Sequence, residues 1–214
     1  MNIPERNPNM LKTERVSVMN LDNALRGMRN PMNSWNKSDS YFDEAGGYIV
    51  GEADLGLASR LVHAGSDHRK FLRQIFVSVD ITAPLYWWKE FDTYKVATVA
   101  NSTSTMHKIH AAPFTAEDFS CERMTEATRK QFDGVIAYLE ELRVRYNETK
   151  DKALWVDMIQ FLPSSYNQMR TVTMNYENLI NMYHARKNHK LTEWHDLCAA
   201  IEQLPYAKEL IIGE

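Results

Sequence analysis

The sequence predicts an α+β fold, with strands in the first half of the chain and a helical carboxyl-terminal half. Apolar and polar residues alternate in the strand-like run Ile75–Ile81, whereas apolar residues recur every three or four positions in the second half. Hydrophobic residues make up 44% of the 214 residues and charged residues 25%, which is typical of a globular protein with a sizeable core. We therefore expect a single domain over residues 1–214.

The first fifty residues predict little regular structure. Residues 1–14 are polar and contain two prolines, so we expect a loose arm. Val16–Leu21 alternates like a short strand, and Asp22 can cap a helix that begins near Asn23. Residues 30–51 are rich in Asn, Ser, Asp and Gly and predict a long loop, a kind of segment that is usually functional or mobile.

The middle of the chain alternates helix and strand. Asp54–Gly65 predicts a helix, since its apolar residues share one face and Gly65 supplies a left-handed stop. The strand Ile75–Ile81 follows, and Pro84 suits the first turn of a helix that carries the run LYWWKEF. The β-branched, hydroxyl-rich run VATVANSTST after it predicts an extended segment or an irregular loop.

Four helices are predicted in the second half. Two have a clear apolar stripe, over 132–146 and over 154–162, and Pro163 ends the second of them. A third is expected from about Val172 to Lys187 and a fourth from about Thr192 to Glu202, closed by Pro205. The mixed charges between 122 and 145 indicate the solvated face of a helix.

Charge and cysteine content exclude several classes of function. The net charge is −3 and the isoelectric point about 6.2, so neither nucleic acid nor an anionic membrane is an expected partner. Cys121 and Cys198 form no CxxC pair and are too few for a secreted disulfide framework. The amino terminus lacks the apolar run of a signal peptide, and no stretch of about 18 apolar residues occurs. We expect a cytoplasmic protein.

Local motifs alone indicate no reaction. The chain lacks GxGxxG, GxxxxGK[ST], HExxH and GxSxG, the minimal patterns of dinucleotide-binding, P-loop, zincin and hydrolase sites. His107 and His110 could share a helical face as metal ligands, but two ordinary solvent-facing histidines are the favoured interpretation and no metal is expected. Tyr86, Trp87, Trp88 and Phe91 could stack on a ring ligand, although burial in the core or at a subunit contact is favoured.

The hydroxyl-rich run TYKVATVANSTST carries a family resemblance. Laid on without gaps, it resembles the signature RHRxxSxNExSxR of the flavin-dependent thymidylate synthases. The RHR falls on Thr93, Tyr94 and Lys95, the two Ser on Thr98 and Thr103, NE on Ala100 and Asn101, and the final Arg on Thr105. Upstream, Lys89 and Glu90 stand at the family's basic-Gln pair, and Gln74 stands at the His of its PxEH element with Arg73 beside it.

The second half resembles the same family. In FLPSSYNQMRTVTMNYENLINMYHAR, the segment LPxxxxTxxxxTxNxxxLxxxxxxR is matched in register at Leu162, Pro163, Thr173, Asn175, Leu179 and Arg186. The later KLTEWHDL resembles the family's AQxEIR run only loosely and lacks its final Arg. The resemblance covers roughly residues 50–112 and 155–205.

The resemblance implies a homo-oligomer, a tetramer in this family, in which FAD carries a hydride from a nicotinamide cofactor to dUMP while a folate supplies the one-carbon unit. Here one cation, Lys95, stands where the family has RHR, Asn101 replaces the Glu, and Thr105 replaces the following Arg. Each lost charge-assisted contact is worth about 1.5–3 kcal/mol, so we expect standard dUMP methylation to be altered or lost.

The resemblance also assigns residues. For FAD it implies contacts from Arg73, Tyr94, Lys95, Asn175 and Arg186; for a nucleotide substrate it implies Lys89, Glu90, Thr98, Asn101 and Thr103. If active, such a protein is a flavin-dependent methyltransferase or oxidoreductase acting on a pyrimidine nucleotide. Two alternatives stay open, an inactive oligomeric interaction protein on the same scaffold and an intact synthase whose functional residues have moved in space. We further expect the segments around Lys95 and Asn175 to lie together and to form a cleft lined by hydroxyls, amides and a few cations.

Overall fold

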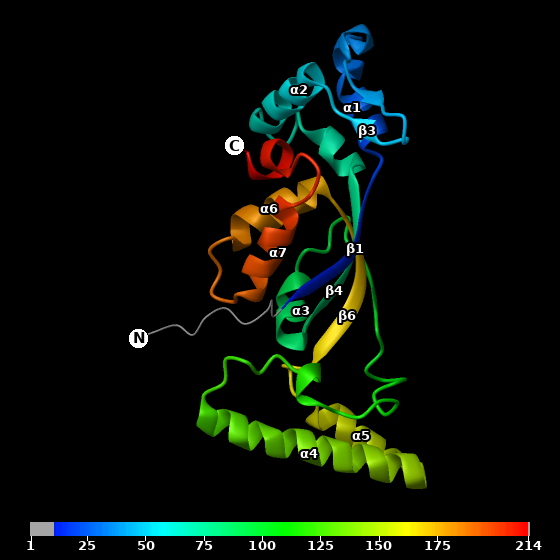
Figure 1. Cartoon of the computed structure of the whole chain (residues 1–214), viewed down its shortest axis with the longest axis vertical. Helices are drawn as coiled ribbons and strands as arrows, with labels where there is room; N and C mark the ends of the chain where they lie inside the picture. Colours follow the sequence, from blue (N-terminus) through cyan, green and yellow to red (C-terminus); the bar gives the residue numbers. More distant parts are fainter. Residues whose placement is uncertain (1–10, 214) are drawn as a thin grey trace. The chain divides into compact units, whose positions relative to one another are not determined.

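The sheet contains four strands. The computed structural model describes residues 11–213, and its strands follow the spatial order β1-β4-β6-β5 (Figure 1). Their bounds are β1 Lys12–Met19, β4 Phe76–Pro84, β5 Val99–Ser102 and β6 Asn167–Asn175. In β4, Val77, Val79, Ile81 and Ala83 are buried and alternate with half-buried polar residues, which is the period-two pattern of a sheet with one apolar face.

The described chain contains seven helices and several short helical turns. The helices are α1 Leu21–Met28, α2 Glu52–His63, α3 Leu85–Phe91, α4 Glu126–Thr149, α5 Lys152–Phe161, α6 Tyr176–Arg186 and α7 Glu193–Glu202. The short turns are η1 Asn30–Met32, η2 Trp35–Lys37, η3 Lys70–Gln74, η4 Ala116–Asp118 and η5 Lys208–Ile212, the last of them π-helical. None of the helices in residues 11–213 combines the length and the hydrophobicity needed to cross a membrane.

The described chain divides into two compact units. Unit 1 contains residues 11–12, 81–93 and 101–170, and unit 2 contains residues 13–80, 94–100 and 171–213. Four of the five boundaries fall within β1, β4, β5 and β6, and the fifth, between residues 93 and 94, lies between α3 and β5. Each unit is therefore built from chain segments that are far apart in the sequence.

The core of unit 1 lies between α4 and α5 and the loop that precedes them. Figure 1 shows the two helices side by side. Phe132, Ile136, Leu139 and Leu142 form the buried stripe of α4, and the spacing of three and four residues places them on one face. Leu154 and Met158 of α5 join the same cluster, together with Ile109, Phe114, Phe119 and Cys121 from the loop.

Unit 2 packs α1, α2, α6 and α7 around another set of buried residues. Trp194, Leu197, Cys198 and Ile201 are buried on α7, and Leu210 and Ile211 of η5 are buried as well. Burial, together with the nearby Glu202 carboxylate, raises the pKa of the Cys198 thiol to about 11, so this cysteine is a neutral packing residue.

Most of the predicted elements are present, with four corrections. Of the arm expected over residues 1–14, residues 1–10 lie outside the described residues and Lys12–Glu14 belong to β1. The first helix begins at Leu21, because Asn20 in a left-handed conformation precedes it, and Asp22 lies in its first turn. The loop over 30–51 contains η1, η2 and the antiparallel hairpin β2 Tyr41–Phe42 and β3 Tyr48–Ile49.

The fourth correction concerns the third helix of the second half. Val172–Asn175 is the end of strand β6, and helix α6 begins only at Tyr176. Asn175 ends the strand because its side chain caps the helix. The α+β class and the mainly helical carboxyl-terminal half are nevertheless confirmed, as are the helices predicted over 132–146, 154–162 and 192–202.

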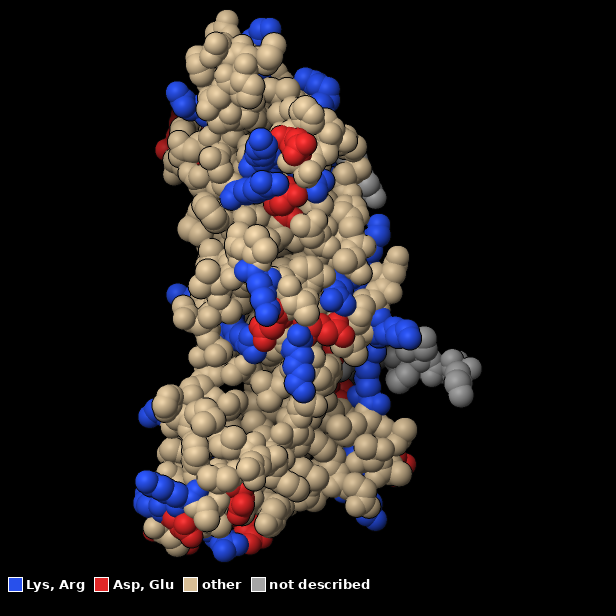
Figure 2. All heavy atoms as spheres, turned by 180° about the vertical axis from the view of Figure 1, so that it is seen from behind, with Lys and Arg blue, Asp and Glu red and all other residues tan. Residues whose placement is uncertain are grey.

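Charges of both signs are interspersed on the molecular surface. On the face shown in Figure 2, Lys and Arg side chains lie next to Asp and Glu side chains, with wide uncharged areas between them. This face therefore carries no extended patch of one sign, which agrees with the net charge of −3.

Candidate ligand-binding site

The segment 94–98 lies against helix α6 in unit 2. The backbone oxygen of Val96 accepts a hydrogen bond of 2.8 Å from Asn178 Nδ2 at the start of the helix. The hydroxyl of Tyr94 accepts one of 2.9 Å from Arg186 Nε at the end of the helix. The expected proximity of the segments around Lys95 and Asn175 is therefore confirmed.

Asn175 organises the beginning of α6. Its side-chain oxygen accepts from Asn178 N at 3.0 Å, and the Asn178 side-chain oxygen accepts from Asn175 N at 3.1 Å. Reciprocal bonds of this kind satisfy backbone N–H groups that the first turn of a helix leaves without a partner. Asn175 is only 3% exposed, so its side chain is buried in this cap. The capping role alone explains why an asparagine stands at this position, without any ligand.

Arg186 is held between two aromatic rings. Its guanidinium carbon lies 5.6 Å from the centre of the Tyr94 ring and 4.6 Å from that of Trp194, which is fully buried at the start of α7. The two rings meet edge to face at 5.9 Å. Cation–π contacts contribute about 0.5–2 kcal/mol each, so the stack fixes the orientation of the Arg186 side chain.

Thr98 contains a buried hydroxyl group with no hydrogen-bond partner. Its Oγ1 is shielded from solvent and contacts no donor or acceptor of residues 11–213. The preceding residue, Ala97, adopts a left-handed backbone conformation with φ of 57°, which costs a non-glycine residue about 1–3 kcal/mol. Native proteins pair nearly all buried polar atoms, so an unpaired hydroxyl beside a strained residue indicates a position that a ligand could complete.

Two exposed cations accompany this segment in unit 2. Lys95 is exposed and forms no ion pair with the residues that the structure describes. Arg73 is exposed on η3, a turn that is joined to α6 because Arg69 forms a bidentate ion pair with Glu177, with N–O distances of 3.0 and 3.2 Å. All five residues to which the resemblance assigned flavin contacts therefore belong to unit 2, together with Thr98.

The other four predicted residues belong to unit 1. Lys89 is exposed and Glu90 half-buried on α3, and Asn101 is exposed on β5. Thr103 is fixed to β6, because both its backbone N–H and its hydroxyl donate to the Met169 carbonyl oxygen, at 2.9 and 3.2 Å. The ten predicted residues are thus divided between the two units.

Unit 1 contains a polar cluster that the sequence patterns missed. Arg170 lies over the Trp88 ring at 4.2 Å, donates to Asp92 Oδ1 at 2.8 Å and donates to Gln168 Oε1 at 3.0 Å. Gln168 in turn donates to the Thr103 carbonyl oxygen at 2.7 Å. Trp87, Trp88 and Phe91 are buried, so the core interpretation of the aromatic run is confirmed.

The histidine pair gives no metal site. His107 is exposed, whereas the His110 ring packs on Tyr146 with ring centres 4.9 Å apart, so only one of the two faces solvent as expected. Within residues 11–213 no three His, Cys, Asp or Glu side chains gather in a way that could hold a metal ion.

Comparisons with known proteins identify the fold. No protein-family model matches the sequence, and no curated protein matches it. Thymidylate synthase X from Helicobacter pylori, solved with FAD and dUMP, superimposes with a TM-score of 0.66 at 18% identity, over 94% of this chain and 95% of that one. A second structure of the Helicobacter pylori flavin-dependent enzyme, again with FAD and dUMP, gives 0.66 and 18% over 92% and 97%. This chain has a flavin-dependent thymidylate synthase fold.

The thymidylate synthase fold explains which predicted residues come together. Residues 94–98 and 175–186 were placed by the family signatures, and these are the two segments that meet in unit 2. Arg186 stacks on Trp194, and Arg170 stacks on Trp88. Trp194 and Arg170 lie within the compared segments, but no motif residue is matched at either position. Their contacts join residues 8 and 82 positions apart, so no local pattern could indicate them.

Proposed function

We propose that this protein is a diverged relative of the flavin-dependent thymidylate synthases that binds a flavin, a nucleotide or both, with standard methylation of dUMP altered or lost. The observation that carries the proposal is the segment 94–98, where an unpaired buried hydroxyl at Thr98 and an exposed ammonium group at Lys95 lie beside α6. Solved proteins of the same fold were determined with FAD and dUMP.

The residues of unit 2 suit a planar ligand that carries phosphates. Lys95 and Arg73 supply exposed cations for phosphate oxygens, Thr98 supplies a hydroxyl donor, and Tyr94 supplies an aromatic ring next to the fixed guanidinium of Arg186. Asn175 supports the site by capping α6. When bound, FAD would supply hydride transfer, and the protein residues would orient it and neutralise its charge.

The residues of unit 1 are assigned to the nucleotide on the family resemblance. These residues are Lys89, Glu90, Asn101 and Thr103, and Lys89 and Asn101 among them are exposed. An active protein would be a methyltransferase or oxidoreductase on a pyrimidine nucleotide. Because uncharged residues stand at Thr93, Asn101 and Thr105, phosphate binding and polarisation of the uracil ring are weaker than in the family. The proposal includes a homo-oligomer, a tetramer by resemblance.

Flavin titration tests the proposal. FAD added to the purified oligomer should be bound, with a change in flavin fluorescence, and Lys95→Ala should weaken the affinity at least about tenfold, the value of one charge-assisted contact. Lys208→Ala is the matched control, since it removes an exposed lysine from the same unit and should leave the dissociation constant unchanged. FMN and dUMP, titrated in the same way, show which part of the ligand the protein binds.

Two results would contradict the proposal. If none of FAD, FMN and dUMP binds, the proposal that the protein binds a flavin or a nucleotide is wrong. If the wild type and Lys95→Ala have equal dissociation constants, the assignment of the site to Lys95 is wrong. Growth of a synthase-deficient host without thymidine would instead support an intact synthase and contradict the loss of standard methylation.

An inactive interaction protein is the second candidate. Val96 in the segment 94–98 is 82% exposed, and Val99, which follows this segment at the start of β5, is 66% exposed. Exposed apolar side chains at this density suit a surface that another protein covers. This candidate predicts a stable oligomer by light scattering that binds no flavin, and Val96→Ser with Val99→Ser should dissociate it.

A further inference from the structure

A hollow in unit 2 is lined by none of the residues assigned to flavin and nucleotide. It is broadly open to solvent and has a volume of about 510 Å³, within the range of about 300–1,000 Å³ that is typical of small-molecule pockets. It is lined by Val18, Asn20, Leu21, Asp22, Tyr48, Pro205 and Tyr206. No residue of the thymidylate synthase signatures is among them, although Asn20 donates to the Gln74 backbone oxygen at 3.0 Å, next to Arg73.

The lining combines one carboxylate with two phenol rings and apolar side chains. Asp22 is half-buried, and its only hydrogen-bond donor within residues 11–213 is the neutral amide of Asn23, at 3.2 and 3.3 Å. No lysine or arginine lines the hollow. The Asp22 charge is therefore without a cationic partner in the described chain, next to aromatic rings whose faces attract cations.

The electrostatic environment of Tyr48 agrees with a negative potential in the hollow. Burial raises the pKa of the Tyr48 hydroxyl, and the carboxylates of Asp54 and Asp22 raise it further, against a lowering hydrogen bond with Ser40. Burial disfavours any charge at this position, whereas the smaller contribution of the two carboxylates disfavours only the phenolate and would favour a cation.

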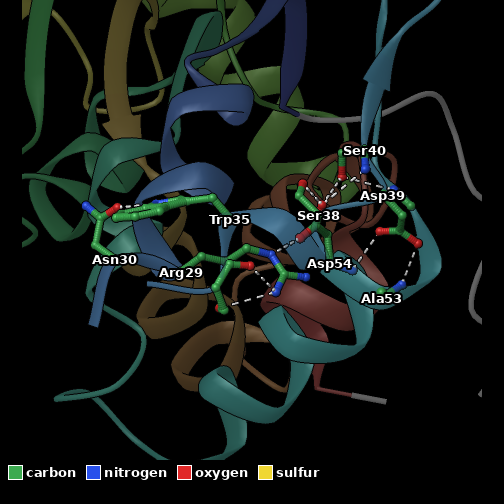
Figure 3. A network of polar contacts seen from close by, with 10 residues as sticks. Arg29, Asn30, Trp35, Ser38, Asp39, Ser40, Ala53 and Asp54 are labelled. Carbon is green, nitrogen blue, oxygen red and sulfur yellow. Dashed lines mark hydrogen bonds and ion pairs between the residues drawn. The ribbon is translucent and has the colours of Figure 1, made fainter. Parts of the chain in front are cut away.

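The wall that carries Tyr48 is held in place by a buried ion pair. Arg29 and Asp54 form it with side chains only 5% and 1% exposed, and Asp54 Oδ2 also accepts from the hydroxyls of Ser38 and Ser40 and from Ser40 N (Figure 3). Asp39 accepts from the backbone N–H groups of Ala53 and Asp54 at 2.8 and 3.0 Å and so caps helix α2 from a distant loop. The loop 30–51 is therefore an ordered wall.

The opposite wall is fixed by Tyr206. Its hydroxyl accepts a hydrogen bond of 2.9 Å from Val50 N, at the end of the same loop, and Tyr176 donates to the Pro205 carbonyl oxygen at 2.7 Å. Tyr206 and Asn20 both adopt left-handed backbone conformations, with φ of 55° and 67°. Asparagine tolerates this conformation, whereas a tyrosine in it carries conformational strain, and both residues line the hollow.

We propose that this hollow is a binding site for a small organic cation, a protonated primary amine that carries an aromatic or apolar group. The ammonium group contacts the Asp22 carboxylate, and the apolar part lies against Tyr48, Tyr206, Pro205 and Val18. The ordered loop 30–51 would then form part of this binding site, because it supplies Tyr48.

Paired titrations of the full-length protein test the site. Benzylamine, which is protonated at neutral pH, and benzyl alcohol, its neutral counterpart, have nearly the same shape. Calorimetry should show benzylamine binding at least about tenfold more tightly, the value of one charge-assisted contact. Amide NMR signals of Asn20–Asp22, Tyr48 and Tyr206 should shift on addition of benzylamine, and the affinity should fall with added salt.

Variants separate the Asp22 contact from a general effect of charge. Asp22→Asn should reduce benzylamine affinity to the level of benzyl alcohol. Asp67→Asn removes an exposed carboxylate of the same unit outside the hollow and should change nothing. Equal affinities of the two probes for the wild-type protein, an unchanged affinity in Asp22→Asn, or signal shifts confined to residues outside the hollow would each overturn the proposal. Flavin titration of Asp22→Asn should match the wild type, so failure here and failure of the proposed function are distinguishable.

Discussion

Two long loops of this protein are each held in place by one carboxylate, and the two carboxylates differ in their exposure to solvent. In unit 2, Asp54 accepts from Arg29 and from the loop 30–51. In unit 1, Glu140 accepts from Arg143 at 2.6 and 2.7 Å and from the backbone N–H of Phe114 at 2.9 Å, in the loop before α4. The donors are of the same kind, an arginine and a loop N–H.

The difference lies in burial. The side chains of Asp54 and Arg29 are 1% and 5% exposed, whereas those of Glu140 and Arg143 are 31% and 14% exposed. Burial tends to raise the pKa of Asp54, but hydrogen bonds from Ser38 and Ser40 and the Arg29 guanidinium outweigh it and lower the pKa. Arg143 is the main cause of the lowered pKa of Glu140. Breaking a buried ion pair therefore costs much more stability than breaking a similar pair that is partly exposed to water.

Truncating the two carboxylates should produce the largest contrast. Asp54→Ala leaves the Arg29 guanidinium buried without its partner, and the free energy of unfolding should fall by about 3–5 kcal/mol. Glu140→Ala leaves Arg143 closer to water, and the loss should be about 1 kcal/mol. Urea denaturation followed by circular dichroism measures both. Equal losses for the two variants would show that burial does not separate these pairs.

A glycine next to the Asp54 network gives the second test. A Cβ atom at Gly51 would lie 2.2 Å from Asp39 Cγ and 2.6 Å from the Asp39 backbone oxygen. Gly51→Ala must displace Asp39 and remove its cap from α2, so it should destabilise the protein by about 1–3 kcal/mol.

Gly134→Ala in α4 is the matched control for that substitution. Nothing lies within 4 Å of a Cβ atom at Gly134, so the change should stabilise the helix by about 0.5–1 kcal/mol. If Gly51→Ala leaves the stability unchanged and the loop intact, the close contact of Asp39 with the backbone at residue 51 is not required. The two melting curves should therefore shift in opposite directions.

The smallest of these effects is a pH dependence. The pKa of Asp54 is lowered in the folded state, so its contribution is fully present above the unfolded value of about 3.9 and is lost as the pH falls through the folded pKa. The stability difference between the wild type and Asp54→Asn should be constant near neutral pH and shrink on acidification below about pH 4. If this stability difference instead grows on acidification, the pKa of Asp54 is raised in the folded state and the assigned direction is wrong.

The helices were predictable where one apolar stripe decides the structure. Phe132, Ile136 and Leu139 mark α4 in the sequence because burial requires this spacing. The strand β6 was missed because Val172 and Met174 continue the apolar pattern of α6, and only β-branched Thr171 and Thr173 indicated a strand. The cap formed by Asn175 and Asn178 uses amide groups in place of the usual Ser or Thr with Glu.

The candidate site was predictable only where a family motif placed residues in register. The contact of Val96 with Asn178 follows from two motif segments, but nothing in the sequence joins Asp54 to Arg29, Ser38 and Ser40. In the sequence Asp54 resembles an ordinary acidic residue in the first turn of a helix. Its burial depends on how a polar loop folds over it, and composition does not determine that.

The hydrogen bond from Val50 to Tyr206 has a consequence for the order of events during biosynthesis. It joins positions 156 residues apart, and unit 2 draws on three separate stretches of chain. While the ribosome is still translating the codons for 13–80, the groups that complete their environment do not yet exist. Loop closure over this length is slow, so we expect this part of the polypeptide to stay open to proteases and chaperones until residue 206 has emerged from the exit tunnel.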